Sequence, residues 1–551
     1  MNALLVLYAG NLSREAAEAV LGGKNSLSLA VERARNFPGV GKTVLLTGPG
    51  QVSLEKMLGH PVPEGVLVEN SDEPWTVKAL LKAIALHSQS GAMPSCDFGY
   101  FVWADCPFLD PVLAGKLAER HLQYAAEYSY ADGWPYGLAP ELLSPGTAAI
   151  LAQILGGDDG GPVERDALFS VIQKDINAFD IETEISSVDL RCHRLTLCAD
   201  SGRNLLLLRR FIEGAGTGDI PDTAAVERIV AEAPDFMRSR GFLRTLPAFY
   251  PIQVFGGCPQ SCAICPWPLV AGPNAETGAV TERRDYMEAG QFQTLLEKII
   301  AFSGDAVIDL SLWGEISLHP QKMELIEMVL RRPELALVIE TSGIGWKHEE
   351  LEQIAELAGK AAARCATFPA ALSWIVSLDT ADPARYKEIR GAGFAEANEF
   401  AKKLLSLFPK TAYVQAVRTA GAEDDIERFY RHWKEISANI IIQKYDDFCG
   451  MLPRKQASDL SPVQRQPCWH LMRDMPILID GTVPLCRQQI CRQKTGGAIT
   501  LGNAFTEPLE TIWEQGRRHY DEQVSALASA EPGAKYDSLC EGCDEYYTYN
   551  F

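Results

Sequence analysis

Short apolar segments alternate with helical patterns along most of this chain of 551 residues. The alternation is clearest from residue 245 to 450, where six strand-like segments are each followed by a helical stretch. Strands that alternate with helices predict an α/β fold with a parallel sheet and right-handed crossovers. Six such units are too few to close an eightfold barrel. The six segments begin near Ile252, Val307, Leu335, Trp374, Ala412 and Asn439.

The chain also contains residues before position 245 and after position 450. Residues 1–220 also predict an α/β domain, because apolar runs such as Val44–Thr47 and Gly99–Trp103 alternate with helical stretches. Two of those helical stretches are Leu27–Arg35 and Val112–Ala126. The predicted order is an α/β domain (1–220), a helical connector (221–244), the parallel α/β part (245–450), a polar linker (451–467) and a cysteine-rich tail (468–551).

Composition and charge narrow the choice of partners. The net charge is −21, which argues against a broad surface for nucleic acid or for an anionic membrane. The chain has no apolar run of about 18 residues that could span a bilayer, and Met1–Tyr8 lacks a basic leader and is typical of a buried strand. We therefore expect a cytoplasmic protein without a nucleic-acid or membrane partner, in which reduced cysteines favour metal ligation.

Three cysteines stand in one short run with the spacing C-x3-C-x2-C: Cys258, Cys262 and Cys265. A cubane iron–sulfur cluster has four irons, so three thiolates leave one iron open for a ligand that is not protein. Zinc sites favour paired C-x2-C motifs or mixtures of cysteine and histidine, and no fourth ligand lies close in the sequence. Buried free thiols are the other alternative. The spacing therefore favours an iron–sulfur cluster.

This run resembles the signature of the radical SAM enzymes. The resemblance implies an open six-unit barrel over residues 245–450 and a catalytic [4Fe–4S] cluster held by the three cysteines. It also implies S-adenosylmethionine (SAM) at the open iron, reductive cleavage of SAM to a 5′-deoxyadenosyl radical, and an electron donor such as flavodoxin or ferredoxin. In such barrels the chemistry lies at the carboxyl ends of the strands.

Two strand ends carry residues similar to SAM-binding motifs of that family. Gly314 and Glu315 resemble the centre of its glycine-glycine-glutamate-proline segment, which implies that Glu315 accepts hydrogen bonds from the SAM amino group. The alternative is a solvated loop carboxylate. Thr341 and Ser342 are similar to the ribose-contacting Thr-Asn-Gly turn, although a simple turn at the end of a strand is the alternative.

The next two strands supply further candidates. Ser377 and Asp379 resemble a Ser-Leu-Asp segment that lies near SAM and substrate in the family. Arg418 is a candidate partner for the SAM carboxylate, with a structural salt bridge as the alternative. Strand alternation places Gln415 and Arg418 on different faces unless a bulge intervenes. Ile264 stands where the family usually has an aromatic residue near the adenine.

The tail contains a second set of cysteines. Their order, with Gly481 followed by four residues and a cysteine and then a C-x2-C pair, resembles the SPASM/twitch extension of radical SAM enzymes. The resemblance implies one auxiliary [4Fe–4S] cluster, and a zinc site is the alternative. Cys449 and Cys491 are spare and are candidates for a second cluster if the tail folds differently. The four predicted ligands are Cys468, Cys486, Cys540 and Cys543.

The residue that follows Cys486 gives information about the kind of substrate. Family members that oxidise a peptide serine or cysteine place an aspartate there as proton acceptor, whereas this chain has Arg487. This weakens a formylglycine-forming interpretation and indicates an anionic group on the substrate. Two substrate classes stay open: a peptide or protein side chain, which the SPASM tail favours by analogy, and an activated sugar. In both, the auxiliary cluster would accept an electron.

Residues 1–220 resemble the sugar nucleotidyltransferases of glycosyltransferase-A (GT-A) type. The segment that contains Lys24 is similar to their Lys-Pro-Leu motif, and Asp105 and Asp200 are similar to their two metal aspartates. The resemblance implies Mg²⁺ and a nucleotide, but the loop Tyr8–Arg14 lacks most of the glycines that cradle phosphates. An active transferase and a domain that only binds its ligand are both open. The alternative for the whole chain is a sugar-phosphate nucleotidyltransferase with structural or redox-regulatory clusters.

Taken over essentially its whole length, the sequence resembles the spirochaete-type SPASM proteins.

Overall fold

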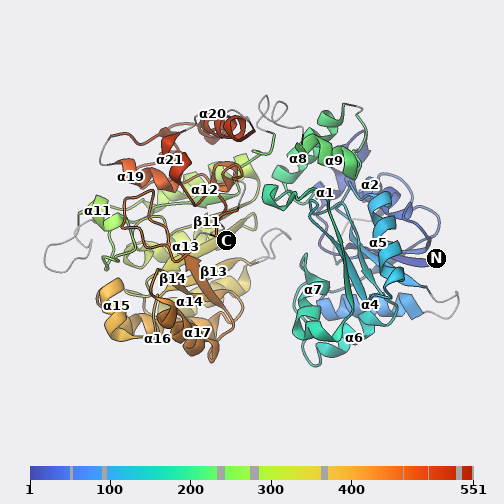
Figure 1. The fold of residues 1–551 in the computed structure, drawn as a ribbon, viewed down its shortest axis with the longest axis horizontal. Helices are drawn as coiled ribbons and strands as arrows, with labels where there is room; N and C mark the ends of the chain where they lie inside the picture. Colours follow the sequence, from blue (N-terminus) through green and yellow to red (C-terminus); the bar gives the residue numbers. More distant parts are fainter. Residues whose placement is uncertain are drawn as a thin grey trace. The chain divides into compact units, whose positions relative to one another are not determined.

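The computed structural model divides the chain into two compact units, an N-terminal unit that ends at Leu243 and a C-terminal unit that begins at Arg244 (Figure 1). None of the helices within the described ranges is both long and apolar enough to cross a bilayer. The residues that the structure describes are 1–49, 54–89, 96–216, 218–231, 242–272, 285–361, 370–458, 460–462, 465–493, 496–528 and 537–548.

A seven-stranded sheet in the order β5-β4-β1-β6-β8-β7-β9 forms the centre of the N-terminal unit. The strand β1 is buried along its whole length and pairs in parallel with β4 and β6. Burial of every residue of a strand requires cover on both faces of the sheet. The strands are β1 (Ala3–Ala9), β4 (Val40–Thr47), β5 (Val66–Asn70), β6 (Phe98–Trp103), β7 (Tyr128–Asp132), β8 (Glu141–Leu143) and β9 (Ile181–Ile185), with a small hairpin of β2 (Val20–Leu21) and β3 (Lys24–Asn25).

The helices of this unit follow the predicted alternation. The helix expected over Leu27–Arg35 is α2 (Ser26–Arg35), which Asn25 caps at its N-terminus. The others are α1 (Arg14–Glu18), α3 (Leu54–Leu58), α4 (Val77–Gln89), α5 (Pro111–Gln123), α6 (Thr147–Ile154), α7 (Ala167–Ile172), α8 (Gly202–Ala215) and α9 (Thr223–Ala231), with 3-10 turns η1 (Gln173–Ala178) and η2 (Arg191–His193).

The C-terminal unit contains the predicted parallel sheet. Its six strands lie in the order of the sequence, and each pairs in parallel with the next. This confirms the predicted α/β class and the open, six-unit arrangement. The strands are β10 (Phe249–Pro251), β11 (Ala306–Asp309), β12 (Leu335–Thr341), β13 (Leu372–Ser377), β14 (Ala412–Arg418) and β15 (Ile440–Lys444).

Helices connect these strands, as the alternation predicted. They are α11 (Trp267–Ala271), α12 (Ala289–Ser303), α13 (Lys322–Leu330), α14 (His348–Lys360), α15 (Pro383–Ile389), α16 (Phe394–Leu407) and α17 (Glu423–Lys434), with the 3-10 turn η3 (Ile316–Leu318). The first strand ends just before Ile252, which instead forms a main-chain bridge with Ile477 of the tail. A second bridge joins Phe249 to Asp474, so the tail lies along the β10 edge of the sheet.

The tail consists of short elements around a two-stranded ribbon and one long helix. They are α18 (Trp469–Arg473), β16 (Thr482–Pro484), η4 (Arg487–Gln489), α19 (Ile490–Gln493), β17 (Thr500–Asn503), α20 (Leu509–Ala528) and α21 (Ser538–Gly542). Arg244, which lies in the segment before β10, connects that segment to these elements of the tail. Its buried guanidinium donates to the carbonyls of Leu471 and Trp513 at 2.8 and 2.7 Å and lies 3.4 Å from the centre of the Trp513 ring.

Replacement of this arginine tests whether it holds the tail in place. We expect Arg244→Leu to lower the free energy of unfolding of the C-terminal unit by about 3 kcal/mol, because two buried carbonyls lose a charged donor. Urea unfolding followed by tryptophan fluorescence measures the change. Arg518→Leu, which removes an exposed arginine from α20, should leave the urea midpoint unchanged. Equal midpoints for both variants would contradict the role of Arg244.

Candidate functional site

The cysteine loop follows β10 and is held from several sides by hydrogen bonds. The Ala263 N–H donates to the Ile389 carbonyl at 2.7 Å, and the Trp267 indole N–H donates to the Gly256 carbonyl at 3.0 Å. The three predicted loop ligands, Cys258, Cys262 and Cys265, all line one cavity of about 550 Å³ at the carboxyl ends of the strands. Burial raises the pKa of each of their thiols. The structure therefore places the three cysteines on the wall of one cavity, and their role as cluster ligands stays a prediction.

Gly314 lies where the loop after β11 meets the cysteine loop. Its φ is +103°, and a Cβ atom there would stand 2.0 Å from the Phe255 carbonyl oxygen. No residue with a side chain fits at that distance, so the glycine of this motif is required by the close approach. The neighbouring Trp313 packs its ring against the buried Trp267, with ring centres 6.5 Å apart and nearly parallel planes. Ile264 lines the cavity beside them.

Glu315 connects two of the predicted motifs. Its main-chain N–H donates to the Gly257 carbonyl at 2.9 Å, and its buried carboxylate accepts from the Thr341 hydroxyl at 2.7 Å and the Ser342 N–H at 2.8 Å. Burial raises the pKa of Glu315, while these donors act in the opposite direction. Glu315, Thr341 and Ser342 all line the cavity. The ends of β11 and β12 thus form one hydrogen-bonded group beside the cysteine loop.

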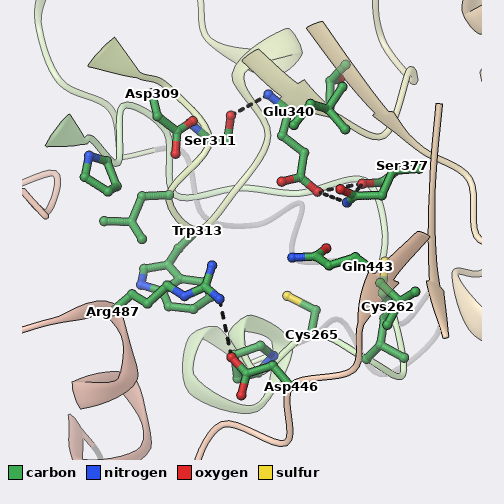
Figure 2. Close-up of a pocket in the computed structure, with 18 of the residues that line it drawn as sticks. Cys262, Cys265, Asp309, Ser311, Trp313, Glu340, Ser377, Gln443, Asp446 and Arg487 are labelled. Atoms are coloured by element: carbon green, nitrogen blue, oxygen red, sulfur yellow. Dashed lines mark hydrogen bonds and ion pairs between the residues drawn. The ribbon is translucent and has the colours of Figure 1, made fainter. Parts of the chain in front are cut away.

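Ser377 belongs to a second group, which includes a carboxylate that the sequence analysis did not select. The Ser377 hydroxyl donates to Glu340 at 2.6 Å, and the Gln415 amide donates to the same oxygen at 2.8 Å. All three residues line the cavity, and Figure 2 shows Glu340 joined to Ser377 across the strand ends. Of Gln415 and Arg418, Gln415 is therefore the one that lines the cavity, on the same side of β14 as Tyr413 and Val417.

Asp379 and Arg418 stand outside the set of described residues that line the cavity. The buried Asp379 has φ +66° and accepts from the Val417 N–H at 2.9 Å and from Arg390 at 2.6 Å. Arg390 does line the cavity, and its charge lowers the pKa of Cys262 against the larger effect of burial. No motif indicated Arg390, because its role depends on a contact with Asp379 and with Gln260 of the cysteine loop.

Charged groups occupy the part of the cavity that faces the tail. Burial raises the pKa of Asp309, at the end of β11, to about 7. Arg487 forms ion pairs with Glu545 at 2.9 Å and with Asp446 at 3.5 Å, the second of which is drawn in Figure 2. The sequence analysis missed Asp309 and Glu340, although both stand at strand carboxyl ends, and that position was the available signal.

The predicted tail ligands Cys468, Cys486, Cys540 and Cys543 line a second, smaller cavity. Cys486 lines both cavities, so it forms part of the wall between them. The Cys449 thiol donates a hydrogen bond to the Cys543 sulfur, which lowers the pKa of Cys543, and Cys491 interacts electrostatically with Cys449. Four thiols around one small space fit either a cubane cluster or a zinc ion.

Comparisons with known proteins bear on this choice. The family model of the SPASM iron–sulfur cluster-binding domain matches residues 468–544. An uncharacterized protein of Treponema pallidum is 36% identical over 392 residues, which is 70% of this chain and 98% of that protein. A second uncharacterized protein of the same organism is 40% identical over 73 residues, 13% of this chain and 32% of that protein.

Two solved structures give weaker similarities. One is Streptococcus suis SuiB bound to the precursor peptide SuiA, with 15% identity, 60% of this chain and 76% of that chain covered, and a TM-score of 0.39. The other is a cytidylyltransferase from Leptospira borgpetersenii, with 15% identity, 42% and 94% covered, and a TM-score of 0.33.

The domain match covers all four tail cysteines, and it accompanies the C-x3-C-x2-C loop and the six-stranded parallel sheet. The tail is therefore an iron–sulfur cluster-binding domain, as the sequence predicted. This chain belongs to the same family as the Treponema pallidum protein, and residues 468–544 form a SPASM domain.

Proposed function

We propose that this protein cleaves SAM reductively to a 5′-deoxyadenosyl radical, which removes a hydrogen atom from a substrate, and that the substrate is oxidised in the overall reaction. The observation that carries the proposal is the shared cavity of about 550 Å³, lined both by the three loop cysteines and by Cys486 of the tail. SAM and a substrate would thus share one cavity that borders the three loop cysteines and one cysteine of the tail, Cys486.

Glu315, Thr341 and Ser342 are the residues we assign to SAM. Each carboxylate oxygen has two acceptor positions, so Glu315 can accept from an ammonium group while it keeps its bonds to Thr341 and Ser342. Those bonds hold the carboxylate in one orientation, and its burial excludes water that would compete for the ammonium. Gly314 places this group against the cysteine loop. Ser377 and Gln415 fix the orientation of Glu340 on the next strands.

The two cysteine sets suit electron transfer, because Cys486 of the tail lines the same cavity as the three loop cysteines. When bound, a loop cluster supplies the electron that cleaves SAM, and an auxiliary cluster accepts the electron that a substrate radical releases. The chain would supply the proton acceptor. Asp309 is a candidate, because its pKa of about 7 lets the carboxyl group take up a proton near neutral pH.

The charges around the cavity favour a peptide side chain over an activated sugar. Arg487, the residue that had indicated an anionic substrate, is already paired with Glu545 and Asp446. Among the residues that the structure describes, no cation lies within ion-pair distance of Asp309 or Glu340, and the charge of Arg487 acts on both of them from further away. A phosphate would be repelled by these carboxylates, whereas a neutral or cationic side chain would not.

Formation of 5′-deoxyadenosine tests the proposed activity directly. Anaerobic protein reconstituted with iron and sulfide, then mixed with dithionite and SAM, should form 5′-deoxyadenosine, measured by mass spectrometry. Cys262→Ala removes one of the loop ligands and should abolish the product. A protein with a full iron content that forms no 5′-deoxyadenosine would contradict the proposal and favour a nucleotidyltransferase with structural or redox-regulatory clusters.

Substitution of Glu315 tests its assignment to the SAM amino group. Glu315→Gln keeps the shape of the side chain but removes the charge, so the affinity for SAM should fall about tenfold. Equilibrium dialysis of labelled SAM against anaerobic protein measures this change. Glu349→Gln, on the exposed first turn of α14, is the matched control and should bind SAM like the unmodified chain. An unchanged affinity of Glu315→Gln would exclude this role.

The iron content of the reconstituted protein tests whether the loop cysteines and the tail cysteines each hold a cluster. The reconstituted protein should contain about eight iron atoms per chain, and a Cys468→Ala/Cys540→Ala variant should keep about four. Zinc in the tail would instead give about four iron atoms and one zinc in the unmodified chain. About twelve iron atoms would show that Cys449 and Cys491 take part in a second auxiliary cluster.

A further inference from the structure

The resemblance of the N-terminal unit to nucleotidyltransferases implies a Mg²⁺ ion held by Asp105 and Asp200. The structure brings these two carboxylates together, since Asp105 follows β6 and Asp200 precedes α8. The guanidinium of Arg165 lies between them. It donates to both oxygens of Asp105 at 2.9 and 2.5 Å and to Asp200 at 3.0 Å.

These bonds occupy the carboxylate oxygens that a metal would need. The second oxygen of Asp200 accepts from the Asn204 amide at 2.7 Å, so each of the four oxygens has an N–H donor. The side chains of Arg165, Asp105 and Asp200 are 19%, 11% and 8% exposed, so solvent screens the group weakly. The Arg165 guanidinium also lies 4.4 Å from the centre of the Trp103 ring, which fixes it from one face.

A hard divalent cation does not fit this arrangement. Mg²⁺ binds lone pairs of oxygen in near-octahedral geometry, and here one acceptor position of each carboxylate oxygen already receives an N–H, with the guanidinium standing between the two carboxylates. An arginine is always charged, and a divalent ion beside it would be strongly repelled in a partly buried site. The other groups beside Asp105 are the thiols of Cys106 and Cys198, whose sulfurs are 3.4 Å apart, and sulfur is a poor ligand for Mg²⁺.

The expected phosphate contacts are also engaged elsewhere. Lys24 forms an ion pair with Glu32 at 2.5 Å. In the loop after β1, the Asn11 amide donates to the Val163 carbonyl at 2.8 Å, and its oxygen accepts from the Tyr8 hydroxyl at 3.2 Å. Within the loop, the Leu12 N–H donates to the Ala9 carbonyl at 3.0 Å, so this N–H does not point towards a phosphate.

We infer that the N-terminal unit works without Mg²⁺, because Arg165 occupies the position between Asp105 and Asp200 that the metal takes in a nucleotidyltransferase. The arginine neutralises part of the charge of the two carboxylates and holds them together. A ligand of this unit is therefore bound without a bridging cation, and the unit does not transfer nucleotides. This inference is independent of the radical chemistry proposed for the C-terminal unit.

Binding of Mn²⁺, a hard cation that substitutes for Mg²⁺, tests the inference on the full chain. Equilibrium dialysis with millimolar Mn²⁺ should give the same stoichiometry for the unmodified chain and for Asp105→Asn, because Asp105 holds no metal. Arg165→Ala removes the guanidinium and should bind one more Mn²⁺ per chain, with a thermal midpoint that is lower than in the unmodified chain and rises when Mn²⁺ is added. Arg14→Ala, which removes an exposed arginine of the same unit, should bind no additional Mn²⁺.

A stoichiometry that is one Mn²⁺ higher in the unmodified chain than in Asp105→Asn would overturn the inference. Release of pyrophosphate from CTP or UTP in the presence of Mg²⁺ and a sugar phosphate, lost in Asp105→Asn, would also overturn it. Both measurements use the unmodified chain, so they decide the question even if Arg165→Ala does not fold. Neither involves SAM, so their outcome is distinct from that of the 5′-deoxyadenosine test.

Discussion

The loop after β11 lies so close to the cysteine loop that only a hydrogen atom fits between Gly314 and the Phe255 carbonyl. Because of this close approach, the Glu315 N–H donates to the Gly257 carbonyl. That hydrogen bond fixes the position of the Glu315 carboxylate at the carboxyl ends of the strands. The carboxylate then orients Thr341 and the turn at Ser342. One steric constraint therefore positions two motifs and the cysteine loop relative to one another.

Much of this arrangement could be predicted from the sequence, because it depends on local patterns. Apolar segments of strand length, separated by helical ones, determine a parallel sheet, and the sheet brings its carboxyl ends to one edge. Cys258, Glu315 and Thr341 follow or end three of these strands, and it was the resemblance of their motifs to those of a known family that assigned them to one site. The short C-x3-C-x2-C spacing likewise needs no distant contact to bring three thiols together.

The partners of charged residues could not be predicted, since they come from distant positions of the chain. Asp379 accepts from Arg390, Arg487 pairs with Glu545, and the Asp105–Asp200 pair is bridged by Arg165. In each case the motif contains one charged residue, and the fold brings a residue of opposite charge into contact with it. A motif can assign a charged residue to a ligand. That residue is available for the ligand only if the fold has not already paired it with an opposite charge, because a buried charge must be compensated.

The attachment of the tail to the sheet, which also joins distant positions of the chain, explains why the tail is part of the site. Main-chain bridges from Phe249 and Ile252 and the buried Arg244 fix the tail along the β10 edge of the sheet. That attachment places Cys486 in the wall shared by the two cavities and Arg487 among the carboxylates of the larger one. The cysteines that we predict to hold an auxiliary cluster, and the charges that we propose to face a substrate, therefore depend on the edge of the sheet as much as on the tail itself.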